Sequence, residues 1–356
     1  MTTYLLAGGG TAGHVNPLLA VADGLRDRDP EAEVLVLGTR EGLEARLVPE
    51  RGYELLFVDK VPFPRRPNRN AAAFPTRFRR AISQVRRHLE DRGVDVVVGF
   101  GGYASAPAYV AASRARVPFV VHEANAKPGL ANILGARRAA GVGVAFDGTP
   151  LKRSSVVGMP LRREIENLDR AALRAEAAAS FDLSPDAPTL LVFGGSLGAL
   201  RLNTAIAGSW RDVLDAGWQL LHVTGDRSDL EDPGEPGYAL RRYVDRMDLA
   251  FAACDFIVSR SGAATVSEIS ALGIPAVYVP YAVGNGEQAL NAASAVAHGA
   301  AILIPDADFT PETVRDRILP LLTDADERAG MAEKAAEIGI RTGTENLIAM
   351  IDEALA

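Results

Sequence analysis

Residues 4–14 read YLLAGGGTAGH, and residues 189–199 read TLLVFGGSLGA. Each stretch is a short apolar run that leads directly into a glycine-rich turn. Apolar runs of this length are typical of strands buried on both faces of a parallel sheet, and a glycine turn after such a strand commonly starts a helix. The pattern begins twice, so the sequence predicts two similar Rossmann-like domains in tandem.

Further apolar runs follow both stretches, and segments with helical spacing separate them. The runs cover residues 34–37, 55–58, 94–99, 119–122 and 142–146 in the first half and 219–223, 256–259, 276–280 and 301–304 in the second. This alternation predicts an α/β fold with a doubly wound parallel sheet in each half. Glycine and proline interrupt the pattern at residues 158–160, so we expect domains of residues 1–158 and 159–343 with a substrate cleft between them.

Two helices can be placed from their apolar spacing. Pro17 suits the first turn of a helix, where its missing N–H costs little. The buried stripe of this helix is expected to consist of Leu18, Val21, Ala22 and Leu25. The final segment, residues 344–356, has the same spacing. The sequence leaves open which domain this segment packs on, the N-terminal domain being one option.

The composition excludes several classes of protein. The 356 residues are 48% hydrophobic and 23% charged, which is typical of a folded chain. A net charge of −7 argues against a general nucleic-acid binder. The single cysteine, Cys254, excludes an intrachain disulfide and a cysteine-built metal site. With no signal-peptide pattern and no apolar stretch long enough to span a bilayer, we expect a protein of the reducing cytoplasm.

The two glycine-rich turns are candidate anion sites. After a parallel strand, such a turn presents backbone N–H groups at the start of a helix, whose dipole adds partial positive charge. One or both turns could hold a phosphate. The alternative is that the glycines only let the helix pack closely on the strand.

The first turn also has the GxGxxG spacing of a dinucleotide site, through Gly8, Gly10 and Gly13. Such sites normally carry an acid at the end of the second strand, where it binds a ribose hydroxyl. Here that strand ends without one, at residues 38–40. Arg40 is able to accept a 2′-phosphate, so an NADP-linked oxidoreductase stays as an alternative function.

His14 directly follows the first turn. The helix dipole disfavours a positively charged ring at this end of a helix, so we expect a neutral imidazole that can accept a proton as a general base. The alternative is a histidine that only bonds to the local backbone.

Six motifs follow one another in a specific order. They are GGTAGH (9–14), GFGGY (99–103), HEAN (122–125), GGSLGA (194–199), SRSGAATVSE (259–268) and EQxxN (287–291). Together they resemble the MurG family of peptidoglycan glycosyltransferases, and the resemblance covers essentially the whole chain.

The resemblance implies a GT-B fold, in which the C-terminal Rossmann-like domain holds most of a nucleotide-sugar donor. It implies inverting transfer of N-acetylglucosamine from UDP-N-acetylglucosamine (UDP-GlcNAc) to the 4-hydroxyl of N-acetylmuramic acid in undecaprenyl-diphosphate-linked MurNAc-pentapeptide (lipid I), which gives lipid II. No metal ion, other cofactor or nucleic acid is implied. The family places the chain at the cytoplasmic face of the cell membrane as a peripheral protein.

The resemblance also assigns roles to residues. The expected catalytic residues are His14 as the base and Asn125 beside the reacting centre. The expected donor-binding residues are Thr11, Ala12, Gly13, Asn125, Arg162, Ser196, Val244, Ala264, Thr265, Glu268, Glu287, Gln288 and Asn291. The expected acceptor-binding residues are Gly13, His14, Tyr103 and Ser105. In this scheme Ser196 and its backbone hold the diphosphate, Val244 offers backbone to uracil, and Glu268 accepts the ribose hydroxyls.

Some residues depart from the commonest family pattern. They are Ala124, Met159, Leu197 and Glu287. These departures bear on the expected sugar contacts. Two alternative functions remain: a sugar-nucleotide-binding protein without turnover, and a UDP-sugar enzyme with a soluble acceptor. The acid pairs Asp306/Asp308 and Asp324/Asp326 have a spacing that suits a metal ion, but we interpret them as solvated turn residues.

A basic segment runs from Lys60 to Arg92. It has ten Lys or Arg residues and two acids, a net charge of +8, which leaves −15 for the rest of the chain. Phe78, Ile82, Val85 and Leu89 form an apolar stripe within it. The expected membrane patch consists of Phe74, Arg77, Phe78, Arg79, Arg80, Arg86 and Arg87, and its partner is an anionic membrane surface. The alternative is an ordinary domain helix with a solvated basic face.

Overall fold

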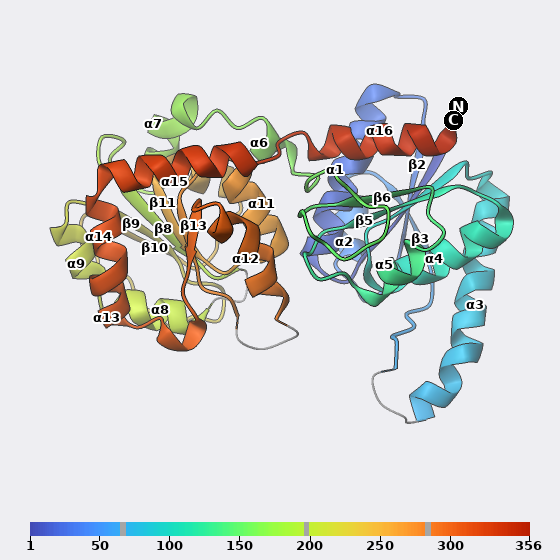
Figure 1. Cartoon of the computed structure of the whole chain (residues 1–356), viewed down its shortest axis with the longest axis horizontal. Helices are drawn as coiled ribbons and strands as arrows, with labels where there is room; N and C mark the ends of the chain where they lie inside the picture. The colour runs from blue at the N-terminus through green and yellow to red at the C-terminus, as the bar shows by residue number, and fades with distance from the viewer. Residues whose placement is uncertain (65–68, 196–198, 282–285) are drawn as a thin grey trace. The chain divides into compact units, whose positions relative to one another are not determined.

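The computed structural model describes residues 1–64, 69–195, 199–281 and 286–356. The chain forms two compact units, which Figure 1 shows with the course of the chain. The N-terminal unit contains Met1–Arg162 and Ile340–Ala356, and the C-terminal unit contains Arg163–Gly339. We expected the first boundary at residue 158, but Gly158 still packs against Ile340 within the N-terminal unit. Gly158 and Pro160 mark a break in secondary structure, and this break lies a few residues before the boundary between the two units at Arg162.

The N-terminal unit is built on a seven-stranded parallel sheet of order β3-β2-β1-β4-β5-β6-β7. Its strands are β1 (Thr3–Ala7), β2 (Glu33–Gly38), β3 (Glu54–Phe57), β4 (Val96–Gly99), β5 (Phe119–Glu123), β6 (Gly141–Val144) and β7 (Ser155–Val156). Its helices are α1 (Ala12–Arg28), α2 (Glu44–Glu50), α3 (Arg69–Arg92), α4 (Gly102–Ala115), α5 (Leu130–Gly135) and α16 (Gly343–Leu355).

The stripe predicted for the first helix is buried, as expected: Leu18, Val21, Ala22 and Leu25 are at most 1% exposed. The predicted start of that helix was wrong, because α1 begins at Ala12 and Pro17 lies in its second turn. The last helix, α16, packs on α1 and on β4, β5 and β6. Gly24 makes this contact possible, since a Cβ there would lie 2.8 Å from Ile348.

The C-terminal unit has a six-stranded parallel sheet of order β10-β9-β8-β11-β12-β13. Its strands are β8 (Thr189–Phe193), β9 (Gln219–Val223), β10 (Tyr238–Arg241), β11 (Phe256–Ser259), β12 (Ala276–Tyr278) and β13 (Ala301–Leu303). Its helices are α6 (Arg163–Glu166), α7 (Arg170–Ser180), α8 (Leu200–Ala207), α9 (Trp210–Asp215), α10 (Met247–Ala253), α11 (Ala263–Ala271), α12 (Glu287–Ala297), α13 (Pro311–Thr313), α14 (Leu319–Thr323) and α15 (Ala325–Ile338), with shorter turns η1 (Asp306–Asp308) and η2 (Val314–Ile318).

Both sheets are doubly wound, which confirms the predicted fold class. In each, the strand order reverses beside the first strand, between β1 and β4 and between β8 and β11. Ligands of such sheets bind outside the carboxyl ends of the strands at this reversal. The two glycine-rich turns lie there.

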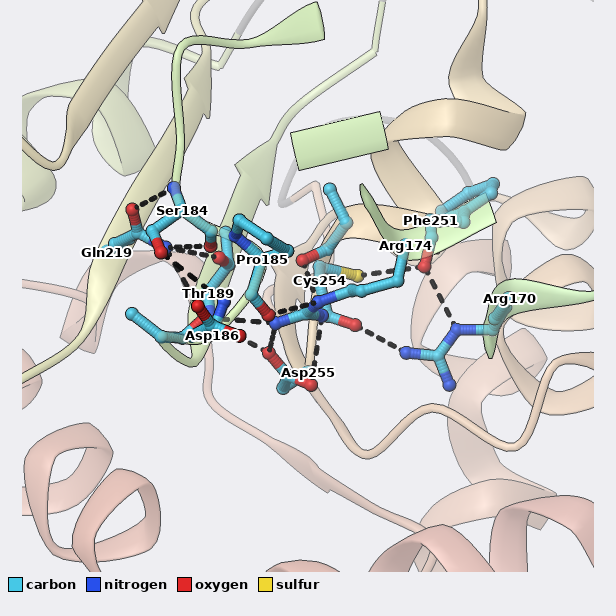
Figure 2. Close-up of polar contacts among 12 residues, drawn as sticks. Arg170, Arg174, Ser184, Pro185, Asp186, Thr189, Gln219, Phe251, Cys254 and Asp255 are labelled. Atoms are coloured by element: carbon cyan, nitrogen blue, oxygen red, sulfur yellow. Dashed lines mark hydrogen bonds and ion pairs between the residues drawn. The ribbon is translucent and has the colours of Figure 1, made fainter. Parts of the chain in front are cut away.

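The amino edge of the C-terminal sheet is closed by an arginine–carboxylate cluster (Figure 2). Arg174 of α7 donates to both carboxylate oxygens of Asp255, at 3.1 and 2.8 Å, and to the carbonyl of Ala187 at 3.0 Å. Asp255 also accepts from the backbone N–H of Thr189 at 2.8 Å. These contacts tie α7 to the starts of β8 and β11, so this edge has a structural role and the opposite edge carries the candidate site.

Each unit also holds one fully buried histidine. The Nε2 atom of His122 lies 3.0 Å from the Gly158 carbonyl, and His222 lies between Tyr238 and Asn203. Burial lowers the pKa of each ring from 6.5 to about 4, because a charged imidazole loses its hydration there.

The protein should therefore lose stability as the pH falls from about 6.5 to about 4. In that window the unfolded chain binds protons at both histidines and the folded chain does not, so unfolding becomes more favourable by about 3 kcal/mol per histidine. Urea titrations at pH 7.5 and 4.5 measure this difference. His222→Gln should show a smaller difference between the two pH values, whereas an unchanged difference would contradict the assignment.

Candidate functional site

Three predicted residues of the N-terminal unit follow neighbouring strands. His14 follows β1, Tyr103 follows β4 and Asn125 follows β5, and these strands are adjacent in the order β1-β4-β5. Tyr103 is 38% exposed, and the Lys60 ammonium lies 5.1 Å from the centre of its ring. The structure thus brings these three expected site residues to one sheet edge.

The ring of His14 has a defined orientation. Its Nδ1 atom lies 3.2 Å from the carbonyl oxygen of Gly9 and 3.2 Å from the hydroxyl of Thr11. A carbonyl only accepts hydrogen bonds, so Nδ1 carries the proton and Nε2 keeps its lone pair. Nε2 faces Gly101, where a Cβ would lie only 3.1 Å away. The backbone bond that we had treated as an alternative therefore selects the tautomer that a base needs.

A buried acid, Glu44, lies beneath the first glycine-rich turn, and the sequence analysis missed it. Its carboxylate accepts from the N–H of Gly10 at 2.7 Å and from the N–H and hydroxyl of Thr39 at 2.8 and 2.9 Å. A Cβ on Gly9 would lie 2.3 Å from this carboxylate, and one on Gly42 would lie 2.0 Å from it. These glycines make room for the acid.

Glu44 bears on the dinucleotide alternative. The N–H of Gly10 is one of those that would hold a pyrophosphate in such a site, and here it donates to the carboxylate. A buried negative charge beneath the turn repels a phosphate. Arg40 stacks on the ring of Phe57 at 4.1 Å. The geometry argues against an NADP site in this unit and favours the C-terminal turn as the anion site.

The loop that carries Asn125 is shaped by a second buried acid, Glu123. One oxygen of Glu123 accepts from the N–H of Asn125 at 2.9 Å, and the other accepts from the N–H of Gly129 and the amide of Asn132, both at 2.9 Å. Tyr109 donates to the Oδ1 atom of Asn132 at 2.8 Å. The HEAN motif thus supplies both the partly buried Asn125 and the carboxylate that positions it.

Ser105, expected at the acceptor, is fully buried. Its hydroxyl lies 2.8 Å from the carbonyl of Ala7 and accepts from the N–H of Gly101 at 3.0 Å. A side chain with no exposed surface is placed to shape the turn after β4. We therefore propose that Ser105 supports this turn and that Tyr103 and His14 make the direct contacts with the acceptor.

In the C-terminal unit, a cavity of about 700 Å³ opens at the carboxyl ends of β8, β11 and β12. It is lined by Gly194, Ala199, Leu200, Arg201, Thr204, Arg227, Arg260, Tyr281, Gln288 and Asp306. Gln288 is the predicted donor residue among them. The expected diphosphate residue Ser196, and Leu197 beside it, lie outside the described residues. The cavity has the position that the second glycine-rich turn predicts, and three arginines give it positive charge.

Arg260 and Asp306 form a mostly buried pair in the wall of this cavity. The Nη1 atom of Arg260 lies 2.5 Å from Asp306 and donates to the carbonyl of Val279 at 2.9 Å. The interpretation of Asp306 as a solvated turn residue was therefore wrong. Asp324 also has a structural role, because it caps α15 by accepting from the N–H of Glu327.

The other predicted donor residues lie on several elements. Ala264, Thr265 and Glu268 are partly exposed on α11, Glu287 is partly exposed on α12, and Val244 is partly exposed between β10 and α10. Asn291 is 1% exposed and donates to the carbonyl of Ser261 at 3.3 Å. We therefore propose that Asn291 braces the start of α11. Arg162 ends the N-terminal unit.

Similarity to known proteins agrees with this geometry. The N-terminal domain of glycosyltransferase family 28 matches residues 4–144, and the C-terminal domain of that family matches residues 189–347. The chain belongs to glycosyltransferase family 28. The predicted glycosyltransferase activity class and the resemblance to the MurG family are thereby confirmed.

Two family 28 relatives match the chain over almost its whole length. A protein of Leifsonia xyli subsp. xyli is 59% identical over 100% of this chain and 99% of its own, and one of Streptomyces coelicolor is 50% identical over 99% and 98%. Each is named UDP-N-acetylglucosamine--N-acetylmuramyl-(pentapeptide) pyrophosphoryl-undecaprenol N-acetylglucosamine transferase. MurG of Acinetobacter baumannii superposes with a TM-score of 0.82 at 28% identity, over 99% of both chains, which agrees with the expected GT-B class.

The basic helix α3 of this family 28 chain carries the residues expected to form a membrane patch and an apolar stripe that is mostly buried. Ile82, Val85 and Leu89 are at most 4% exposed and belong to the core of the N-terminal unit, so most of the apolar stripe is not a surface. At the start of the helix, Phe63, Phe74 and Phe78 are mutually in contact, with ring centres 5.3 to 6.2 Å apart. No helix in the described ranges is long and apolar enough to cross a membrane.

Proposed function

We propose that this chain transfers N-acetylglucosamine from UDP-GlcNAc to the 4-hydroxyl of lipid I with inversion, giving lipid II for peptidoglycan synthesis. The observation that carries the proposal is 59% identity, over the whole chain, to a relative named for this transfer. The geometry of the two sheet edges supports it, because one edge offers a base and the other offers a positively charged cavity.

On the acceptor side, the lone pair of His14 Nε2 takes the proton of the attacking hydroxyl. General bases of this kind contribute about 10²- to 10⁴-fold to a rate. The Gly9 carbonyl stabilises the imidazolium that forms, since it already accepts from Nδ1 at 3.2 Å. Asn125, held by Glu123, supplies an amide that orients the sugar beside the base.

On the donor side, the departing UDP carries growing negative charge. Arg201, Arg227 and Arg260 line the cavity that would receive its diphosphate. Gly194, which follows β8, lies in the same wall and belongs to the glycine-rich stretch that the sequence analysis assigns to the diphosphate. We assign uracil to the backbone near Val244, the ribose to Glu268, and the transferred sugar to Glu287 and Gln288. Thr11, Ala12 and Gly13 start α1 and, with Arg162, complete the expected donor set.

Transfer of radiolabelled sugar from UDP-GlcNAc to a lipid I analogue tests the proposal. We expect labelled lipid II in the presence of EDTA, because the arginines and the turn supply the positive charge. Transfer only to soluble sugars, or release of labelled sugar without an acceptor product, would contradict it. UDP titration followed by calorimetry checks the donor half separately.

We also propose that the start of α3 lies against an anionic membrane surface, where the lipid-linked acceptor would be held. The first turns of this helix extend away from the sheet of its unit (Figure 1). Arg77, Arg79 and Arg80 are exposed on the same part of the helix as Phe74 and Phe78, and Arg87 is exposed in a later turn of α3. Arg80 pairs with Asp59 and Arg86 pairs with Glu90, so the positive charge is partly compensated.

Replacing Arg79, Arg80 and Arg87 together with glutamine should weaken binding to vesicles with 30% anionic lipid by about 100-fold, at about 1 kcal/mol per charge. Co-sedimentation measures the effect. The same charge change at Arg211, Arg315 and Arg317 of the C-terminal unit is the control and should have little effect. Equal binding of the two triple variants would argue against a membrane role for α3.

A further inference from the structure

The peptide between Gly9 and Gly10 joins two groups that do not touch each other. Its N–H donates to Glu44 at 2.7 Å, and its carbonyl oxygen lies 3.2 Å from Nδ1 of His14. Both bonds belong to one planar amide unit, so a carboxylate and an imidazole are coupled through a single peptide group.

The burial of Glu44 depends on specific neighbours. It is 0% exposed, and burying a carboxylate costs free energy unless donors surround it. Three donors from Gly10 and Thr39 do so. The carboxylate also requires glycine at 9, 38 and 42, because a Cβ at each position would lie within 2.4 Å of the Glu44 side chain. An apolar side chain would fill this space without needing hydrogen-bond donors around it.

The electronic consequence follows from the polarity of the amide. A carboxylate that accepts the N–H of an amide increases the negative charge on its carbonyl oxygen, since hydrogen bonds in a chain strengthen one another. The Gly9 oxygen then accepts more strongly from Nδ1 of His14. Such a bond favours the imidazolium form and fixes the tautomer, as a carboxylate bonded directly to an imidazole does.

We propose that Glu44 is a positioning residue that acts on His14 through the Gly9–Gly10 peptide, holding the ring in its base tautomer and raising its proton affinity. The catalytic part of this inference rests on the proposed function of His14. Other titratable groups lie at the carboxyl ends of the strands on this side of β1: His122 and Glu123 end β5, and Tyr103 follows β4 at the start of α4. Burial is the main cause of the lowered pKa of His122, and a charge on His14 lowers it slightly further.

Glu44→Gln keeps the shape of the side chain and removes its charge. Its amide cannot accept from both Gly10 and Thr39, because one of its two ends is a donor. We expect kcat for lipid I to fall by about 10- to 100-fold and the acid limb of the kcat/KM profile to move to lower pH. The KM for UDP-GlcNAc should stay within about twofold. Asp23→Asn is the matched control, since Asp23 is another buried acid of this unit, bonded to Tyr53 at 2.7 Å. It should leave the acid limb in place.

Two NMR measurements separate this inference from the catalytic role of His14. In the wild-type protein, the Gly10 amide should be protected from hydrogen exchange, and its shift should follow the titration of the His14 ring; this needs no variant. In Glu44→Gln, the ring should titrate at lower pH. An unprotected Gly10 amide, or an acid limb and ring titration unchanged in a folded Glu44→Gln protein, would overturn the inference. If the ring responds while His14→Ala keeps turnover, the coupling stands and the assignment of the base fails.

Discussion

His14→Ala is expected to lower kcat with lipid I by about a thousandfold and to leave the affinity for UDP within about twofold. The Nε2 atom of the ring faces Gly101 and keeps its lone pair, so removal of the ring leaves the acceptor hydroxyl without a base. The variant should remain folded, because His14 is only partly buried and α1 is held by its apolar stripe. Steady-state transfer and calorimetric UDP titration measure the two effects.

The control for this prediction is His298→Ala, which removes a surface imidazole at the end of α12. Its turnover should match that of the wild-type protein. Unchanged turnover in His14→Ala would remove His14 from the mechanism, and a large loss of UDP affinity would mean that the residue acts on the donor.

Arg260→Met is expected to raise the KM for UDP-GlcNAc by about 100-fold, the size of effect expected when a charge-assisted hydrogen bond is lost. It should also lower the free energy of unfolding by about 3 kcal/mol, because Asp306 is left mostly buried without its cation. Arg260 is 9% exposed and lies in the cavity wall, so it serves both the ligand and the fold.

A second substitution separates these two effects. In Arg260→Met/Asp306→Asn, no lone charge stays buried, so stability should recover while the KM stays high. Arg315→Met is the control, since Arg315 pairs with Asp212 at the surface at 2.8 Å. Surface pairs contribute little, and neither quantity should change much. A KM that recovers with stability would mean that Arg260 has no direct role in donor binding.

The fold could be predicted because its strands are short apolar runs between helical segments, a pattern that local sequence carries. The same local pattern did not decide at α3 between a membrane patch and an ordinary domain helix. Phe78, Ile82, Val85 and Leu89 have helical spacing, but periodicity does not say whether a core or a membrane covers a stripe. The start of α1 was also misplaced, because Pro17 is tolerated in a second turn.

The candidate site was predicted in part. His14, Asn125, Glu268 and Gln288 lie in motifs that can be recognised from the sequence. Glu44, Glu123 and Arg260 were missed as functional groups, because each owes its role to partners that the fold brings close. Asp306 is the plainest case. We interpreted it as a solvated turn residue, but its partner Arg260 comes from a different strand end. Tertiary contacts determine which charged side chains are buried and paired, and a single sequence does not show those contacts.

The closing helix has a consequence for biosynthesis. Leu347, Ile348 and Ile351 of α16 are buried in the core formed by residues at the beginning of the chain. These residues of α16 are synthesised after residues 163–339, so the N-terminal unit cannot complete its core until the whole C-terminal unit has been made. Residues 163–339 have all their own partners earlier. The later-synthesised half should therefore reach its native state first, which reverses the usual vectorial order of folding.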